Sequence, residues 1–404
     1  MSGWRPTIDT VGAAASDVGL GVFAFAYLAY PVVAAARAAI TPRPYRTGSP
    51  PGAVSVVIAA HDEEADVAAK LDSVVVAARS VSSVVEVVVA DDGSSDRTVD
   101  EAEAAAARAP IPIRVLRLPR GGKAAALEAA VRETTGDLLV FTDANSMLGP
   151  DSLRHLLEPF ADGDVGGVAG DQVYDQGSGT LGERLHWTFD RWLKTAESAA
   201  GSTVSATGAL YAVRRRHFSG VPADVTDDFF ISTGVVAGGE RLVFAPGAVV
   251  TEPAAETMSS EYARKVRVMT RGLRGVVARR QLLAAGHGFY AVSFLSRKVV
   301  RRLSGPALLV SALGSAIGWR QSSRHRAVAA MSATIAAVGT VGLAVPQLVR
   351  GRPWIGLPAF VCASVAASTQ ALFNVATGVR ITRWERPSSG VGGPPGSEQP
   401  TTRP

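Results

Sequence analysis

Hydrophobic residues follow three different patterns along this chain. Uncharged apolar stretches lie towards its two ends, at 18–36, 303–319, 327–349 and 353–379. Between them, short runs of β-branched residues alternate with segments of helical period. A third pattern, over 260–302, sets apolar residues such as Val266 and Leu273 against arginines and lysines with helical spacing. Together, the patterns predict a globular α/β unit joined to apolar helices by a basic amphipathic segment.

The alternating region predicts a mainly parallel sheet with helices between its strands. Four short runs rich in β-branched residues are expected to be strands, at 54–60, 84–90, 111–118 and 138–142. We expect helices to start after Asp62 and after Asp96, because a carboxylate at a helix start can bind free backbone N–H groups, and a third helix to start at Lys123. Repeated βα units of this kind indicate a Rossmann-like α/β sheet, which binds ligands beyond the carboxyl ends of its strands.

The apolar stretches predict membrane-spanning helices. The first, at 18–36, passes the lower limit of about 17 residues for a spanning helix. Asp17 precedes it and Arg37, Arg43 and Arg46 follow it, which predicts that the next domain is cytoplasmic. Near the other end, 303–319 contains a proline and is borderline, so the sequence leaves three or four spans open.

These patterns divide the chain into five parts and predict a multi-pass protein of the cell (inner or plasma) membrane. We expect an N-terminal transmembrane helix in 1–40, an α/β domain in 50–255, amphipathic interfacial helices in 256–302, C-terminal transmembrane helices in 303–380 and a disordered tail in 387–404. Membrane lipids are therefore expected partners of the chain.

The composition narrows the possible classes of function. A formal net charge of +5 at pH 7 is modest for 404 residues, and many cations gather beside the apolar stretches, where they suit anionic lipid headgroups. No basic stripe interleaved with aromatic residues is present, so nucleic acid is not an expected partner. Cys362 is the single cysteine, which excludes an intrachain disulfide, and the 6 histidines lack the spacing of a zinc site.

Polar side chains follow two of the expected strands directly. Asp91 and Asp92 come after the second strand, and Asp143 with Asn145 comes after the fourth. A carboxylate at the second position can bind ribose hydroxyls or base N–H groups of a nucleoside. The oxygens of Asp143 and Asn145 suit a hard divalent cation that bridges a diphosphate. Each pair taken alone is also typical of an ordinary turn or helix cap.

Two further positions can also be interpreted either as structural or as functional. Asp227 and Asp228 open an expected helix, where they are either N-terminal caps or a general base for an attacking hydroxyl. Lys123 begins a helix after two glycines, a place suited to phosphate but also to an ordinary surface lysine. The order and spacing of the motifs are more specific than any one of them.

Taken together, the motifs resemble glycosyltransferase family 2, and especially its membrane-integrated branch related to cellulose, chitin and hyaluronan synthases. The resemblance covers residues 54–280 and rests on AAHDEE at 59–64, DDGS at 91–94, Gly-Lys at 122–123, Asp-Ala-Asn at 143–145 and Thr-Asp-Asp at 226–228. It implies an α/β domain of the GT-A fold, Rossmann-like and mainly parallel, together with α-helical transmembrane segments.

The resemblance also implies roles for individual residues. It assigns nucleotide-sugar binding to His61, Glu63, Asp91, Asp92, Lys123, Asp143, Arg271 and Arg274. It makes Asp228 the catalytic base, with Asp227 beside it. Gly208 and Ala209 resemble the segment that lines the acceptor side. Asp143 and Asn145 stand at the metal motif, so the expected cofactor is Mg²⁺ or Mn²⁺.

The sequence departs from the family pattern at two places. Asn145 replaces the second metal carboxylate, and the segment 270–275 lacks the tryptophan on which a polymer's terminal sugar stacks. We therefore expect an inverting transferase that moves a sugar from a nucleotide-diphosphate sugar, with a UDP-sugar the expected donor, to a hydroxyl of a lipid or glycan acceptor at the cytoplasmic membrane face. A processive polysaccharide synthase coupled to export and an inactive nucleotide-binding homologue are the alternatives.

Overall fold

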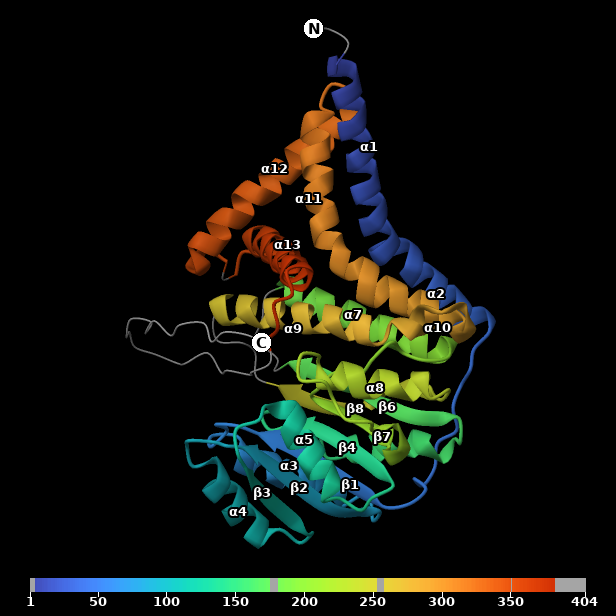
Figure 1. Cartoon of the computed structure of the whole chain (residues 1–404), viewed down its shortest axis with the longest axis vertical. Helices are drawn as coiled ribbons and strands as arrows, with labels where there is room; N and C mark the ends of the chain where they lie inside the picture. Colours follow the sequence, from blue (N-terminus) through green and yellow to red (C-terminus); the bar gives the residue numbers. More distant parts are fainter. Residues whose placement is uncertain (1–3, 175–180, 253–257, 350, 382–404) are drawn as a thin grey trace.

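The computed structural model describes residues 4–174, 181–252, 258–349 and 351–381. A twisted sheet with its covering helices forms the lower half of Figure 1, and long helices rise above it. The expected disordered tail, at 387–404, lies outside the described residues. Helices α7, α9 and α10 lie across the molecule between the sheet and the rising helices (Figure 1).

The sheet has 8 strands in the order β3-β2-β1-β4-β7-β6-β8-β5. Their bounds are β1 (Val54–Ala60), β2 (Val84–Asp92), β3 (Ile113–Leu118), β4 (Leu138–Asp143), β5 (Met147–Leu148), β6 (Val165–Tyr174), β7 (Leu210–Arg214) and β8 (Arg241–Glu252). The four predicted strands pair in parallel, which confirms that part of the fold. β7 runs antiparallel to its neighbours β4 and β6, so the start of β7 lies at the same sheet edge as the end of β4.

Helices cover both faces of the sheet. The helices associated with the sheet are α3 (Val67–Ala78), α4 (Thr98–Arg108), α5 (Lys123–Arg132), α6 (Ser152–Leu157), α7 (Leu181–Ala200) and α8 (Asp227–Ala237). Alternate residues of β1 enter different cores: Val56 and Ile58 pack on the α3 side, whereas Val57 packs with Leu127 of α5. Because both faces are buried, the strand is apolar throughout, and each fully buried valine or leucine stabilises the fold by about 1.5–3 kcal/mol.

One expected helix cap is wrong. Asp62 does not cap the first helix of the sheet, because α3 begins at Val67 and Asp66 occupies the N-cap position. Asp62 has a φ of 54°, and its carboxylate accepts a hydrogen bond from the Ser95 backbone N–H at 2.8 Å. The residue therefore ties the loop after β1 to the loop after β2. Asp96 does accept a hydrogen bond from the first helical N–H of α4, that of Thr98, at 2.9 Å.

The N-terminal helix is longer than the expected 18–36 stretch. It runs without a break through α1 (Trp4–Ala24), a π-helical turn at Phe25–Ala29 and α2 (Tyr30–Ile40). Tyr30 and Ala34 are buried against Leu193 of α7. One face of the second half of this apolar helix therefore packs on protein, a distinction that hydrophobicity alone does not make.

The remaining helices follow the sheet domain in sequence. They are α9 (Met258–Ala278), α10 (Phe289–Phe294), a π-helical segment η6 (Leu295–Val300), α11 (Arg301–Ile317), α12 (Ser323–Ala344) and α13 (Pro353–Ala376), with short 3₁₀ turns at Arg280–Leu283, Ala285–His287 and Pro346–Leu348. Two more 3₁₀ turns, at Glu158–Ala161 and Arg215–His217, lie within the sheet domain. Within the described residues, three helical segments are long and apolar enough to cross a membrane: Ile8–Ile40, Ser323–Ala344 and Pro353–Ala376.

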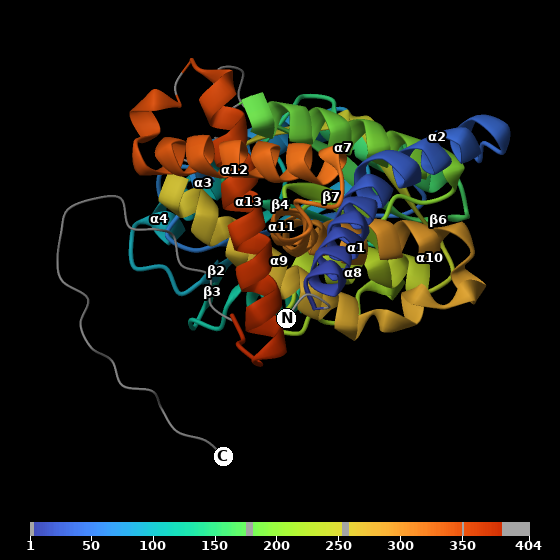
Figure 2. The same cartoon turned by 90° about the horizontal axis from the view of Figure 1, so that it is seen from above.

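Helix α11 lies alongside α1 (Figure 1), and glycines allow the close approach. A Cβ atom at Gly314 would lie 2.6 Å from the carbonyl oxygen of Gly12 and 2.7 Å from the Ser16 nitrogen. Small residues at such crossings are typical of helices that pack in membranes. Seen from above, α13 crosses over α9 (Figure 2), so the apolar helices rest on the layer of helices that covers the sheet.

Candidate active site

Lys123 joins two acidic motifs that are far apart in the sequence. Its ammonium lies 2.6 Å from the Asp143 carboxylate at the end of β4 and 2.9 Å from the Asp227 carboxylate at the start of α8. The lysine begins α5 directly after Gly122, whose φ of 88° is a conformation that favours glycine. Burial opposes the charged lysine, but Asp143 and Asp227 raise the pKa of its ammonium above the usual value. The ammonium therefore stays positive at the centre of the site.

Tyr211 brings the third carboxylate into the same place. This tyrosine of β7 is fully buried, and its phenolic oxygen has no hydrogen-bond partner among the described residues. Burial raises the pKa of the phenol, and Asp227, Asp228 and Asp143 raise it further. Three carboxylates from two distant motifs thus act on one phenol, so the motifs converge at one edge of the sheet.

The two adjacent aspartates at the start of α8 have opposite electrostatic environments. Burial and the neighbouring Asp227 raise the pKa of Asp228 to about 6. For Asp227, burial is outweighed by Lys123, which lowers the pKa of the carboxyl. Neighbouring carboxyl groups whose pKa values are pushed apart are typical of acid–base sites. Asp228 is the one of the pair that is poised to accept a proton near neutral pH.

Gly208 leaves space beside the Asp143 carboxylate. A Cβ atom at this position would lie 3.1 Å from Asp143 Oδ2 and 3.7 Å from the Lys123 ammonium. The next residue, Ala209, accepts a hydrogen bond from the Thr142 hydroxyl at 2.6 Å, which fixes the loop before β7 against the end of β4. The predicted acceptor-side segment thus lies beside the predicted metal motif.

The oxygen atoms at the end of β4 fit a cation that is shared with a substrate. Asp143 ends the strand and Asn145 follows in the turn after it. No group of three or more histidine, cysteine, aspartate or glutamate side chains in the described chain is arranged to hold a metal ion. Magnesium-type sites often use one or two protein oxygens and complete the shell with phosphates and water. Asp143 and Asn145 fit that kind of site and do not form a closed protein cage.

The predicted nucleoside residues lie at the same sheet edge. The Asp92 carboxylate accepts hydrogen bonds from the backbone N–H groups of Gly121 and Gly122, at 2.7 and 2.8 Å, and pairs with Arg120 at 2.9 Å. These contacts hold the start of α5, and with it Lys123. The Asp91 carboxylate accepts a hydrogen bond from the Ser94 N–H at 3.1 Å.

The loop after β1 completes this edge. His61 lies 3.2 Å from the Asp62 carboxylate, and the Glu63 backbone N–H donates to the Thr98 hydroxyl at 2.7 Å. Glu63 itself is buried. The loops after β1 and β2 are therefore held together by side-chain hydrogen bonds, and Asp92 links them to the start of α5.

The two predicted arginines of α9 are held by neighbouring loops. Arg271 donates to the backbone carbonyl of Val225 at 3.0 Å, just before the aspartate pair of α8. Arg274 pairs with Asp224 at 3.2 Å and donates to the Val379 carbonyl at 2.8 Å. Arg267, one turn earlier, is half-buried and has no carboxylate in ion-pair contact among the described residues. Arg267 was not predicted as a site residue, although it lies in the same basic segment of the sequence.

A buried lysine beneath the site was also missed. Lys70 of α3 is fully buried, and its ammonium donates to the Thr142 hydroxyl at 2.7 Å and to the Ser146 carbonyl. Burial lowers the pKa of this lysine to about 7, while Asp143 and Glu252 oppose the shift. Lys70 therefore supports the turn that carries Asp143. Its sequence signal is a lysine between Val67 and Leu71, on the apolar face of the helix.

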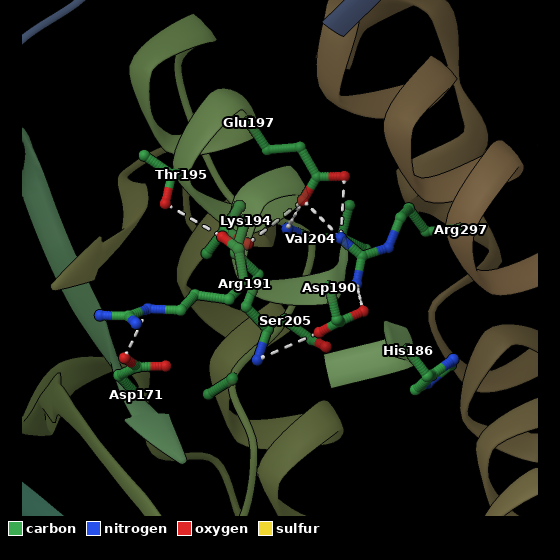
Figure 3. Close-up of polar contacts among 12 residues, drawn as sticks. Asp171, His186, Asp190, Arg191, Lys194, Thr195, Glu197, Val204, Ser205 and Arg297 are labelled. Atoms are coloured by element: carbon green, nitrogen blue, oxygen red, sulfur yellow. Dashed lines mark hydrogen bonds and ion pairs between the residues drawn. The ribbon is translucent and has the colours of Figure 1, made fainter. Parts of the chain in front are cut away.

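A network of buried charges, here called the α7 network, lies behind the site. It consists of Tyr30, Asp190, Lys194, Glu197, Arg297 and Arg301. Arg297 lies between two carboxylates of α7, 2.6 Å from Asp190 and 3.1 Å from Glu197 (Figure 3). Arg301 contacts Asp190 at 3.1 Å, and the Tyr30 hydroxyl donates to Glu197 at 2.6 Å. The network links the N-terminal helix, α7 and the segment that enters α11.

Two family models match the chain. Residues 55–220 match glycosyl transferase family 2, and residues 138–375 match glycosyl transferase family group 2. The second match alone covers more than half of the 404 residues. The matched regions contain the residues at the sheet edge and extend through the apolar helices.

Similar proteins include enzymes of known activity. The chain is 36% identical over 30% of its length to an undecaprenyl-phosphate 4-deoxy-4-formamido-L-arabinose transferase of Pseudomonas paraeruginosa, of which it covers only 37%. It is 25% identical to an N-acetylglucosaminyltransferase of Mesorhizobium japonicum, over 74% of each chain. In structure it is similar to a mannosyltransferase of Pyrobaculum calidifontis in complex with GDP-Man and Mn²⁺, with a TM-score of 0.65, 23% identity and coverage of 88% of this chain and 99% of the other. At that identity the last likeness concerns the fold.

Proposed function

Because this chain belongs to glycosyl transferase family 2, we propose that it transfers a sugar from a nucleotide-diphosphate sugar to a lipid acceptor, with inversion at the anomeric carbon. The observation that carries this proposal is the convergence of Asp143, Asp227 and Asp228 around Lys123 and Tyr211. One edge of the sheet then offers both cation-binding oxygens and a carboxyl group of raised pKa. Transfer from a nucleotide sugar to a hydroxyl group can use both of these.

In the proposed reaction, Asp228 accepts the proton of the acceptor hydroxyl. The acceptor oxygen forms a bond to the anomeric carbon while the bond from that carbon to the diphosphate breaks. Lys123 holds positive charge beside the departing diphosphate, and Asp143 and Asn145 would hold Mg²⁺ or Mn²⁺, which would neutralise the diphosphate when bound. The loops that carry His61, Glu63, Asp91 and Asp92 are assigned to the nucleoside, with a UDP-sugar as the proposed donor.

The basic residues of α9 are assigned to the diphosphate side of the site. Arg271 supports the loop before Asp227, and Arg274, on the same helix, pairs with Asp224 of that loop. Arg267 joins this assignment because it lies on the same helix and has no counterion in the described chain. An arginine that is free to bind phosphate oxygens in pairs suits that role.

The acceptor is proposed to be a lipid because of the apolar helices and the relatives. The arabinose transferase of Pseudomonas paraeruginosa has a lipid phosphate in its name, and three helical segments of this chain are long and apolar enough to span a bilayer. The missing tryptophan in 270–275 favours single transfer over processive synthesis. We place the protein in the cell membrane with several spans and with the sheet domain on the cytoplasmic side.

A measurement of nucleoside-diphosphate release tests the proposed activity. Full-length protein in lipid nanodiscs is incubated with Mn²⁺, a membrane lipid extract and, in turn, UDP- and GDP-sugars. Release that depends on both the sugar nucleotide and the lipid supports the proposal, and release from none of the donors contradicts it. Asp100→Asn, an exposed substitution on α4 whose side chain is 75% exposed, is the matched control for substitutions of the site aspartates.

The orientation is tested by cysteine labelling. Cys362 is the single cysteine, so a Cys362→Ser background carries only an introduced Asp100→Cys. A membrane-impermeant maleimide should label this residue only after the cells are permeabilised. Labelling of intact cells would contradict the cytoplasmic placement.

A further inference from the structure

Two cations near Asp228 have no carboxylate in ion-pair contact within the described residues. Lys298 lies in η6 and Arg302 lies one turn later at the start of α11; together they are called the open cation pair. Both are half-buried. Within the described residues, neither has a carboxylate in ion-pair contact, whereas Arg297 and Arg301, the preceding residue in each case, are matched by the α7 network.

The known contacts of the open cation pair leave hydrogen-bond donors unused. The Lys298 ammonium donates to the Ser205 hydroxyl at 2.6 Å and lies 5.3 Å from the centre of the Phe229 ring. Arg302 Nη1 donates to the carbonyls of Gly272 and Lys298, at 2.8 and 3.2 Å. The other N–H groups of this guanidinium find no acceptor among the described residues. Spare donors on two adjacent cations are what an anionic ligand requires.

The backbone of α9 makes room for this arrangement. The Arg302 guanidinium lies against Gly272, and a Cβ atom at that position would collide with it. One turn further, a Cβ atom at Gly275 would lie 2.7 Å from the Phe229 ring, which is the ring beneath Lys298. Two glycines of α9 therefore allow the open cation pair to lie close to the start of α8.

Electrostatics link the open cation pair to the proposed base. Burial, then Arg302 and Arg297, lower the pKa of the Lys298 ammonium well below its usual value, and Asp228 opposes this shift. Burial lowers the pKa of Arg302 to about 10, again opposed by Asp228. An anion bound at this place would relieve the repulsion between the two cations and would lie close to Asp228.

We propose that Lys298 and Arg302 bind the phosphate group of the lipid acceptor and hold its reacting oxygen beside Asp228. This inference rests on the proposed glycosyl transfer and names the acceptor class. Location favours a lipid, because the open cation pair lies where η6 enters α11, and α11 packs along the apolar helix α1. A headgroup that approaches along these helices meets the cations and the proposed base together.

The phosphate can belong to either of two kinds of lipid acceptor. If the phosphate lies next to a hydroxyl, the hydroxyl oxygen bonds to the anomeric carbon, its proton passes to Asp228, and the nucleoside diphosphate leaves. If a phosphate monoester itself attacks, its ionised oxygen bonds to the anomeric carbon, the bond from that carbon to the nucleoside diphosphate breaks, and no proton is transferred. The two sources share the phosphate chemistry that the open cation pair would recognise.

Binding to defined lipids tests the proposal. The full-length protein in detergent micelles is titrated with farnesyl phosphate, with dihexanoyl-phosphatidylglycerol and with the neutral alcohol farnesol. We expect at least one phosphate lipid to bind about tenfold or more tightly than farnesol. Lys298→Gln and Arg302→Gln should each weaken that binding about tenfold, and Lys298→Arg should largely restore it. The phosphate lipid whose binding is weakened by these substitutions identifies the source of the phosphate.

Controls separate this inference from the proposed function. Arg280→Gln removes an exposed cation of the same region and should leave phosphate-lipid binding unchanged. Stabilisation of each variant by UDP-sugar and Mn²⁺ in a thermal-shift assay reports on folding and on the donor site. The proposal fails if phosphate lipids bind no better than farnesol. It also fails if the substitutions at Lys298 and Arg302 weaken binding of the sugar donor, or leave phosphate-lipid binding unchanged. Loss of donor-dependent turnover with intact lipid binding would instead contradict the proposed function.

Discussion

The two arginines of the α7 network lie on the same helical segment as the open cation pair but differ from it in their surroundings. In the α7 network, buried arginines have carboxylates at 2.6–3.1 Å, and Glu197 is fully buried. In the open cation pair, the partners are a hydroxyl, two carbonyls and an aromatic ring. A buried charge without a partner is costly, so proteins usually match it. The contrast indicates that the α7 network joins the helices, whereas the open cation pair is kept for a ligand.

The largest expected effect is on activity, at Asp228 near the open cation pair. Asp228→Asn should lower turnover about 10²–10⁴-fold, because a positioned general base contributes that much. Stability should be retained or slightly raised, since the pKa of this carboxyl is raised in the folded protein. The checks are a release assay and a thermal unfolding curve, with Asp100→Asn beside them. Near-normal turnover would remove Asp228 from the role of base.

A large effect on stability is expected from a substitution in the α7 network. Glu197→Gln leaves Arg297 with one carboxylate in place of two and should destabilise the fold by about 3–5 kcal/mol. Thermal unfolding in detergent measures the loss. Glu103→Gln is the control, because Glu103 pairs with Arg117 on the exposed surface and its loss should lie within the measurement error. Equal effects of the two substitutions would mean that the α7 network does not hold the helices together.

The pH dependence of activity tests Asp228 as the general base. Since Asp228 has a raised pKa of about 6 and acts as the carboxylate, kcat/KM should fall about tenfold per pH unit below pH 6. The titratable groups that face this carboxyl include Asp227, Lys123, Lys298, Arg302 and the neutral Tyr211 phenol. A profile that is flat between pH 7 and about 5 would contradict the assignment.

The smallest effect is expected from a substitution that fills the space beside the Asp143 carboxylate. Gly208→Ala places a Cβ atom 3.1 Å from Asp143 Oδ2, so the carboxylate must shift slightly. We expect the Mn²⁺ concentration for half-maximal activity to rise roughly threefold to tenfold. Gly163→Ala, where a Cβ atom meets nothing within 4 Å, is the control. Identical metal requirements in both variants would exclude a tight fit at Gly208.

Much of the sheet could be predicted because its signals are local. β1 has the predicted bounds, α5 starts at the predicted Lys123, and the other three predicted strands differ from their predicted bounds by at most two residues. The later strands β5 to β8 were not predicted as strands, because their pairing is set by partners distant in the sequence. The strand β7, for example, pairs with β4 across a separation of about 70 residues, and that pairing places Tyr211 beside the acidic motifs.

By itself, the sequence determined the alternating strands and helices, the apolar helices and the acidic motifs at strand ends, since periodicity and turn chemistry depend on neighbouring residues. Only the tertiary structure decided which charges are matched. Lys70, Arg297 and Lys298 are similar basic residues in the sequence, yet Lys70 supports a turn, Arg297 joins helices, and Lys298 has no carboxylate in ion-pair contact in the described part of the chain. The difference arises because the partner of a buried charge comes from a distant segment, and folding alone brings the two together.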